Sequence, residues 1–160
     1  MNEPSVAHET IVLKRRYDAS ADRLFAAFED VNARARWSAP SDKTAIVFQE
    51  TDFRVGGRDV SRCGAKGDPQ YLVEVRYLDI VRGHRIVFSE LVEHGAKRLS
   101  ASLVTVDIHR DGSGAQLILT IQIASFDGED MAAGNKAGYG AALNNLADYL
   151  LRSPVDSHRQ

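Results

Sequence analysis

Apolar and polar residues alternate over much of this chain, and a period of two is the spacing of half-buried β-strands. Thr10–Asp18 is the first such run. After Thr44 the extended runs follow one another closely, with turn-forming residues between them. Strands joined by short turns pair antiparallel. The runs are Ala45–Gln49, Asp59–Gly64, Tyr71–Leu78, Arg85–Val92, Leu99–His109 and Ala115–Phe126.

Two short helices are predicted between the first strand and Thr44. Ser20 is suited to cap the first helix, and Asp22 lies in its first turn, where the helix dipole favours a negative charge. The second helix is predicted over Asn32–Ser38, ending at Trp37 before a Pro-containing break. The apolar stripe of the first helix consists of Leu24, Phe25, Phe28 and Val31.

The last predicted helix, roughly Asp130–Leu151, has very small residues along the first half of its apolar stripe. Glycine costs about 1 kcal/mol relative to alanine inside a helix, so glycines there require a reason. Either the backbone packs closely against a neighbour, or the helix covers an unfilled space. The small residues are Ala132, Ala133, Gly134, Gly138, Gly140, Ala141 and Ala142, and the larger ones that follow are Leu143, Leu146, Tyr149 and Leu150.

This order of elements predicts an α+β architecture with helices on one face of an antiparallel sheet. A single domain is expected over residues 9–151, with flexible tails at 1–8 and 152–160. A 44% hydrophobic and 26% charged composition fits one globular domain that can bury a core.

The formal net charge of −2 gives no electrostatic reason to expect binding to nucleic acid or to an anionic membrane. The local basic clusters, at Lys14–Arg16 and at Arg34 and Arg36, are interpreted as solvated surface. No segment has the roughly 18 apolar residues of a membrane helix, and Met1–Thr10 does not have the pattern of a signal peptide.

The single cysteine, Cys63, cannot form an internal disulfide, which suits a reducing compartment, and we expect a cytoplasmic protein. The five histidines have no metal-ligand spacing, so we expect no metal and no cofactor. No nucleophile elbow or phosphate-binding glycine loop is present.

Several stretches together resemble a known superfamily. They are Tyr17–Phe28, Arg34–Trp37, Phe53–Arg58 with its Gly56-Gly57 pair, Glu74, and Gly140–Leu150. In this order they resemble the helix-grip fold of the START-like (SRPBCC) superfamily, and within it the group related to the activator of Hsp90 ATPase and to the calicheamicin self-resistance protein. The resemblance implies a curved antiparallel sheet of about six or seven strands around a long C-terminal helix, with a cavity between them.

The resemblance also implies a family whose members bind varied apolar molecules, some of them catalysing cyclisation or contacting a chaperone. Two features depart from the family pattern. Asp59 and Ser61 stand where bulky apolar residues are common after the glycine pair, and Tyr139 stands where the final helix often has a tryptophan. If Asp59 and Ser61 point inward, the cavity has a polar corner.

Seven residues are the candidate contacts to a ligand in this cavity: Trp37, Asp59, Ser61, Glu74, Asn135, Tyr139 and Ala142. Trp37 is either a core plug or an apolar wall of the cavity. Asn135 and Tyr139 are four residues apart and so share a helix face. Among the strand carboxylates Asp59, Glu74 and Glu90, most are expected to face water, but one facing the cavity would have a raised pKa.

The first hypothesis for function is binding of a small apolar or aromatic molecule between the C-terminal helix and the sheet. The alternatives are a polyketide cyclase/dehydratase-like enzyme with a buried carboxylate as general acid or base, and an interaction module that activates an Hsp90-type ATPase. The sequence does not decide between binding and catalysis, identifies no catalytic residue, and leaves a homodimer open. The animal Hsp90 activator has a separate N-terminal Hsp90-binding domain. We expect no such domain in these 160 residues, which places the chaperone alternative last.

Overall fold

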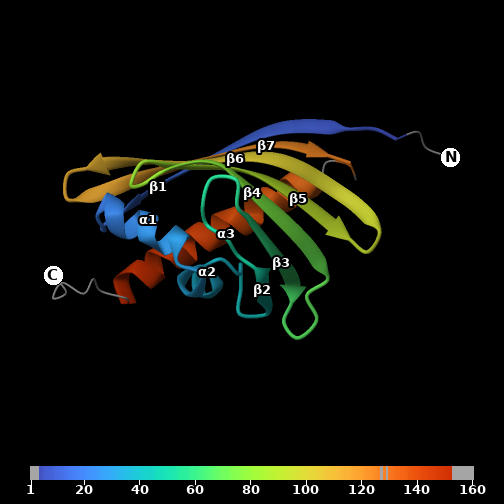
Figure 1. Ribbon diagram of the computed structural model, residues 1–160, viewed down its shortest axis with the longest axis horizontal. Coiled ribbons are helices and arrows are strands. Elements are labelled where there is room, and N and C mark those ends of the chain that lie inside the picture. The colour runs from blue at the N-terminus through green and yellow to red at the C-terminus, as the bar shows by residue number, and fades with distance from the viewer. Residues whose placement is uncertain (1–3, 127, 129, 153–160) are drawn as a thin grey trace.

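The structure, a computed structural model, describes residues 4–126, 128 and 130–152 (Figure 1). Within these residues, seven strands and three helices follow one another. The elements are β1 (Ala7–Tyr17), α1 (Ala21–Glu29), α2 (Val31–Trp37), β2 (Thr44–Glu50), β3 (Arg58–Ala65), β4 (Tyr71–Val81), β5 (Arg85–His94), β6 (Lys97–Asp111), β7 (Gly114–Ser125) and α3 (Asp130–Arg152).

All seven strands form one antiparallel sheet in the order β1-β7-β6-β5-β4-β3-β2. Only the pairing of β1 with β7 joins strands that are not consecutive in sequence. The sheet curves over α3, and all three helices lie against its concave side (Figure 1). The predicted α+β helix-grip fold is therefore confirmed, including the two short helices after the first strand.

Several strands run further than the alternation predicts. Strand β4 continues from Leu78 to Val81, and its register with β5 shifts between Tyr77 and Asp79. An extra residue at a β-bulge reverses the inward and outward pattern, so the apolar alternation breaks while the strand continues. At the ends, Ala7 and His8 belong to β1 and Arg152 closes α3, whereas residues 1–3 and 153–160 of the predicted tails lie outside the described residues.

The junction of α1 and α2 follows local capping chemistry. Ser20 Oγ accepts a hydrogen bond from the backbone N–H of Arg23 at 3.1 Å, as predicted for an N-cap. Asp30 serves both helices, because its N–H closes α1 on Ala26 O and its carboxylate accepts from the N–H of Asn32 at 2.9 Å. Asp30 thus ends the first helix early, and Val31 begins α2 rather than extending the stripe of α1.

The C-terminal half of α3 is anchored in the core. Leu143, Leu146 and Leu150 are buried there. Tyr17 Oη donates a 2.8 Å hydrogen bond to the carbonyl of Leu143 and so ties α3 to the end of β1. On β7, the alternating apolar residues Leu117, Leu119, Ile121 and Ile123 are all buried and belong to the same core.

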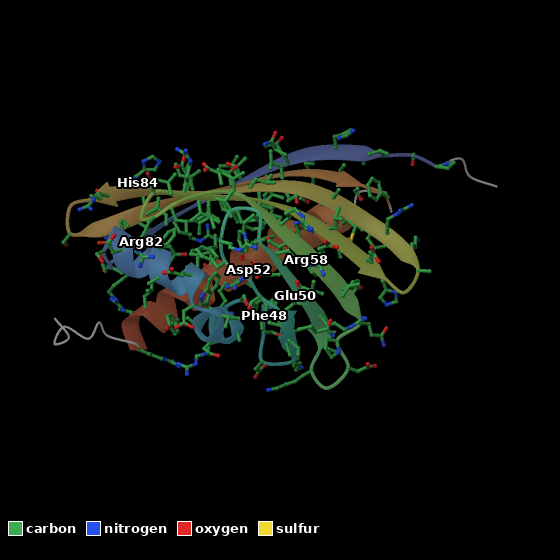
Figure 2. All side chains as sticks on the ribbon, viewed as in Figure 1. Phe48, Glu50, Asp52, Arg58, Arg82 and His84 are labelled. Carbon is green, nitrogen blue, oxygen red and sulfur yellow. The ribbon has the colours of Figure 1, made fainter. Side chains whose placement is uncertain are left out.

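The opposite face of the sheet near β3 is polar. Arg58 on β3 forms ion pairs with Glu50 on β2 at 3.1 Å and with Glu74 on β4 at 3.4 Å. Figure 2 shows Glu50, on the edge strand β2, near Arg58, on the neighbouring strand β3. No helix in the described part of the chain has both the length and the apolar character needed to cross a bilayer.

Candidate functional site

A cavity of about 640 Å³ lies between the N-terminal half of α3 and the half of the sheet formed by β2 to β5. Helix α2 and the loop that follows it close one side through Trp37, Ser38 and Pro40. Most of the wall is apolar, because these strands point their alternating apolar residues inward. This part of the wall includes Ile46, Phe48, Val73, Val75, Phe88 and Val92.

The small residues of α3 make room for the cavity. A Cβ atom added at Gly134 would meet no heavy atom within 4 Å, and one at Gly138 would meet only Pro40 Cγ at 3.9 Å. Both glycines and Ala142 line the cavity. Of the two explanations for glycines in this helix, an open space therefore applies at Gly134 and Gly138, and close backbone packing does not.

The first polar cluster centres on Asp59, whose side chain is only 3% exposed. Asp59 Oδ2 accepts a 2.7 Å bond from Arg34 Nη1 and a second bond from the hydroxyl of Tyr77. Asp59 Oδ1 accepts from the backbone N–H of Asp52 at 3.2 Å. Burial raises the pKa of Tyr77 well above its ordinary value, so this hydroxyl remains a donor. The carboxylate is thus held as one member of a buried ion pair.

The second polar cluster joins β5 to α3. Tyr139 Oη donates a 2.8 Å hydrogen bond to Glu90 Oε2. Burial raises the pKa of Glu90, although the bond from Tyr139 opposes the shift, and burial also raises the pKa of Tyr139. Asp59, Val75 and Glu90 are successive cross-strand partners, so the two clusters lie about 10 Å apart on the same face of the sheet.

Cys63 also faces the cavity, and burial raises the pKa of its thiol to about 11. Only the thiolate attacks alkylating reagents, so at pH 8 we expect Cys63 to react about 100-fold more slowly than a free cysteine. Its alkylation rate, followed by intact mass spectrometry beside N-acetylcysteine, should still rise about tenfold between pH 9 and pH 10. A rate that levels off near pH 9 would contradict this burial.

Six of the seven candidate residues line the cavity: Trp37, Asp59, Ser61, Asn135, Tyr139 and Ala142. Asn135 and Tyr139 share a face of α3 as predicted, and Asp59 and Ser61 form a polar corner. Glu74 is the exception. It alternates with Val73 and Val75, which point inward, so it lies on the outer face and pairs with Arg58.

Three important residues were not among those candidates. Arg34 was interpreted as solvated surface, which is wrong, because its side chain is only 12% exposed and pairs with Asp59. Glu90 was named among the strand carboxylates, and it faces the cavity with a raised pKa, as expected for such a position. Tyr77 could have been found from alternation, since it shares a face with Val75. Arg34 offers no such signal, because a short helix gives little information about which residue faces a distant strand.

No cluster of three or more histidine, cysteine, aspartate or glutamate side chains suited to a metal occurs among the residues that the structure describes. The polar groups of the described lining are the Arg34–Asp59 ion pair with Tyr77, the Glu90 carboxyl with Tyr139, the Asp130 carboxyl, and a few hydroxyl, thiol and amide groups. Such groups can orient a ligand by hydrogen bonds and can exchange a proton with it.

Comparisons with known proteins agree with this fold. The family described as Activator of Hsp90 ATPase homolog 1-like protein matches residues 18–151. The Mll3558 protein from Rhizobium loti is 40% identical, over 91% of this chain and 99% of its own, with a TM-score of 0.81. A putative uncharacterized protein from Rhizobium leguminosarum is 28% identical, over 95% and 100%, with a TM-score of 0.83.

CalU16 from Micromonospora echinospora is 21% identical, over 95% of this chain and 86% of its own, with a TM-score of 0.61, and shows the shared fold alone. No curated protein matches the chain. The family match spans most of the sequence, including the first strand–helix junction, the glycine-containing hairpin and the final helix. The chain therefore belongs to the family of activator of Hsp90 ATPase homolog 1-like proteins, within the START-like (SRPBCC) superfamily.

Proposed function

We propose that this protein binds a small apolar or aromatic molecule in the cavity between α3 and the sheet. The observation that carries the proposal is the open space above the glycine-rich half of α3. Protein interiors are close-packed, and voids in a core are destabilising. A space of about 640 Å³ among mostly apolar side chains lies within the size range of ligand sites.

The residues proposed to contact the ligand divide by chemistry. Trp37 and Ala142 offer apolar surface, while Asp59, Ser61, Asn135 and Tyr139 offer polar contacts at a few points. A predominantly apolar wall with few polar groups is typical of sites that gain affinity from burial and orientation from hydrogen bonds. Glu74 is not part of this proposal, since it lies on the outer face of the sheet.

Gly138→Leu is expected to weaken binding of an apolar probe such as 2-ethylnaphthalene by at least about tenfold. A leucine on a helix leans toward the preceding turn, here over Gly134 and Asn135, which line the cavity. Losing space for two or more methylene-sized groups costs about 1.6 kcal/mol or more. Isothermal titration calorimetry measures the change.

Ala137→Leu is the matched control, because Ala137 is exposed on the same helix and does not line the cavity. Its affinity should equal that of the unmodified chain. The probe should also slow alkylation of Cys63, the only cysteine of the sequence. Equal affinities in both leucine variants, or binding that leaves Cys63 fully reactive, would place the probe elsewhere and contradict the proposal.

A second candidate is an acid–base enzyme of the polyketide cyclase/dehydratase type, favoured by the presence of a carboxyl with a raised pKa inside the cavity. The residue we propose for that role is Glu90, because Asp59 is held in an ion pair. The test is product formation from a polyketide-like substrate. If Glu90→Gln abolishes product formation but retains binding, catalysis is favoured over binding alone.

A further inference from the structure

The described lining of the cavity has more acidic than basic side chains before any ligand enters. Arg34 is the one basic side chain among the described lining residues, and Asp59 already neutralises it. The other titratable lining residues are Cys63 on β3, Tyr71 and Tyr77 on β4, Glu90 on β5, and Asp130 and Tyr139 on α3. No cation therefore remains in this wall to balance an additional negative charge beside Glu90.

Glu90 uses only one of its two oxygens within the protein. Oε2 accepts from Tyr139, and no hydrogen bond joins Oε1 to any other described residue. Directly across the β5–β6 pairing lies Ser102, so its side chain shares the face of Glu90. Ser102 is 7% exposed, and its Oγ has no hydrogen-bond partner in the described structure. This point of the sheet therefore has unused hydrogen-bonding capacity, although buried polar groups are normally paired.

We propose that Glu90 and Tyr139 recognise an uncharged oxygen group of the ligand, a ketone carbonyl or a phenolic hydroxyl, with Glu90 as a neutral carboxylic acid. The Oε1 hydroxyl donates to the ligand oxygen, while Oε2 continues to accept from Tyr139. Tyr139 Oη can in turn accept from a ligand hydroxyl. This inference rests on the proposed binding function and adds the chemical class of the ligand.

The same geometry disfavours a carboxylate ligand at this point. An ionised ligand beside Glu90 would bury a charge with no free cation nearby, which is strongly unfavourable. Burial favours the neutral form of Glu90 for the same reason, and its pKa is raised accordingly. A carbonyl or hydroxyl group gains a hydrogen bond without adding charge.

Three probes of nearly equal shape test the inference by calorimetry at pH 6: 2-ethylnaphthalene, 2-acetylnaphthalene and 2-naphthoate. We expect the ketone to bind about three- to tenfold more tightly than the ethyl compound, the usual range for one neutral hydrogen bond. The carboxylate should bind most weakly. If 2-naphthoate binds most tightly, or the ketone has no advantage, the inference is wrong.

Two substitutions assign the preference to Glu90. Glu90→Leu should still bind 2-ethylnaphthalene but lose the preference for the ketone. Glu90→Gln should keep it, because the amide can donate to a carbonyl and does not titrate. The preference should fall with rising pH in the unmodified chain and stay constant in Glu90→Gln. A leucine variant that keeps the full preference would overturn the assignment.

Stability without ligand gives an independent readout. A carboxyl whose pKa is higher in the folded than in the unfolded chain makes the folded state bind its proton more tightly. Relative to Glu90→Gln, the unmodified chain should be most stable below pH 4 and lose stability as the pH rises above the unfolded value of about 4.3. A constant difference between pH 4 and pH 8 would contradict a neutral Glu90.

Failure of this inference and failure of the binding function are distinguishable. If 2-ethylnaphthalene binds, protects Cys63 and loses affinity in Gly138→Leu, the cavity binds apolar molecules. This conclusion holds whether or not the ketone binds more tightly than the ethyl compound. If none of the three probes binds at millimolar concentration or protects Cys63, both the binding function and this inference are wrong.

Discussion

Replacing Asp59 by alanine is expected to lower the free energy of unfolding by about 3–5 kcal/mol. The substitution leaves the Arg34 guanidinium, whose side chain is only 12% exposed, without its counter-ion. It also removes the acceptor for the hydroxyl of Tyr77 and for the N–H of Asp52. An uncompensated buried charge costs more than the lost contact itself. Urea unfolding followed by circular dichroism measures the loss.

Two comparisons separate this mechanism from a general loss of contacts. Adding Arg34→Met to Asp59→Ala should recover part of the stability, because the double variant has no stranded charge. Glu29→Ala, which breaks the exposed pair with Arg82 on the surface, should cost about 1 kcal/mol or less. If the double variant is less stable than Asp59→Ala alone, or if Asp59→Ala costs no more than Glu29→Ala, a stranded charge is not the cause.

The elements of the fold could be predicted because each has a local signal. Alternation locates the strands, Ser20 and Asp22 mark the first helix, and the change from small to large residues divides α3 into two halves. The limits of β4 and of α1 escaped prediction for equally local reasons. A register shift interrupts alternation after Tyr77 without ending the strand. Asp30 is both the C-cap of α1 and the N-cap of α2, so a single residue separates the two helices.

For the candidate site too, local patterns could be predicted and contacts between distant elements could not. Alternation within a strand tells which residues share a face, so Ser61, Asp59 and the inner residues of β4 could be grouped from the sequence. Which face is inward depends on the whole sheet. Glu74 was a reasonable candidate until the pairing showed that its neighbours Val73 and Val75 face the cavity. Contacts between distant elements, such as Arg34 with Asp59, follow only from the assembled fold.

Trp37 unites the two interpretations considered for it, since it is 5% exposed and also lines the cavity. Its indole Nε1 donates a 3.0 Å hydrogen bond to Ala27 O, one of the last carbonyls of α1, which lack partners within that helix. Its ring meets Phe28 edge-on with the centroids 4.9 Å apart. One side chain thus closes the end of α1 and forms a wall of the cavity.

Trp37→Ala is therefore expected to cost about 3–5 kcal/mol of stability, as large aromatic truncations in cores do. Trp37→Phe should cost clearly less, because it keeps an aromatic ring against Phe28 and loses mainly the hydrogen bond to Ala27. Denaturant unfolding followed by far-ultraviolet circular dichroism is the measurement, since the chain has a single tryptophan and both variants lose its fluorescence. If Trp37→Ala costs less than about 1 kcal/mol while still weakening probe binding, Trp37 serves the ligand rather than the core.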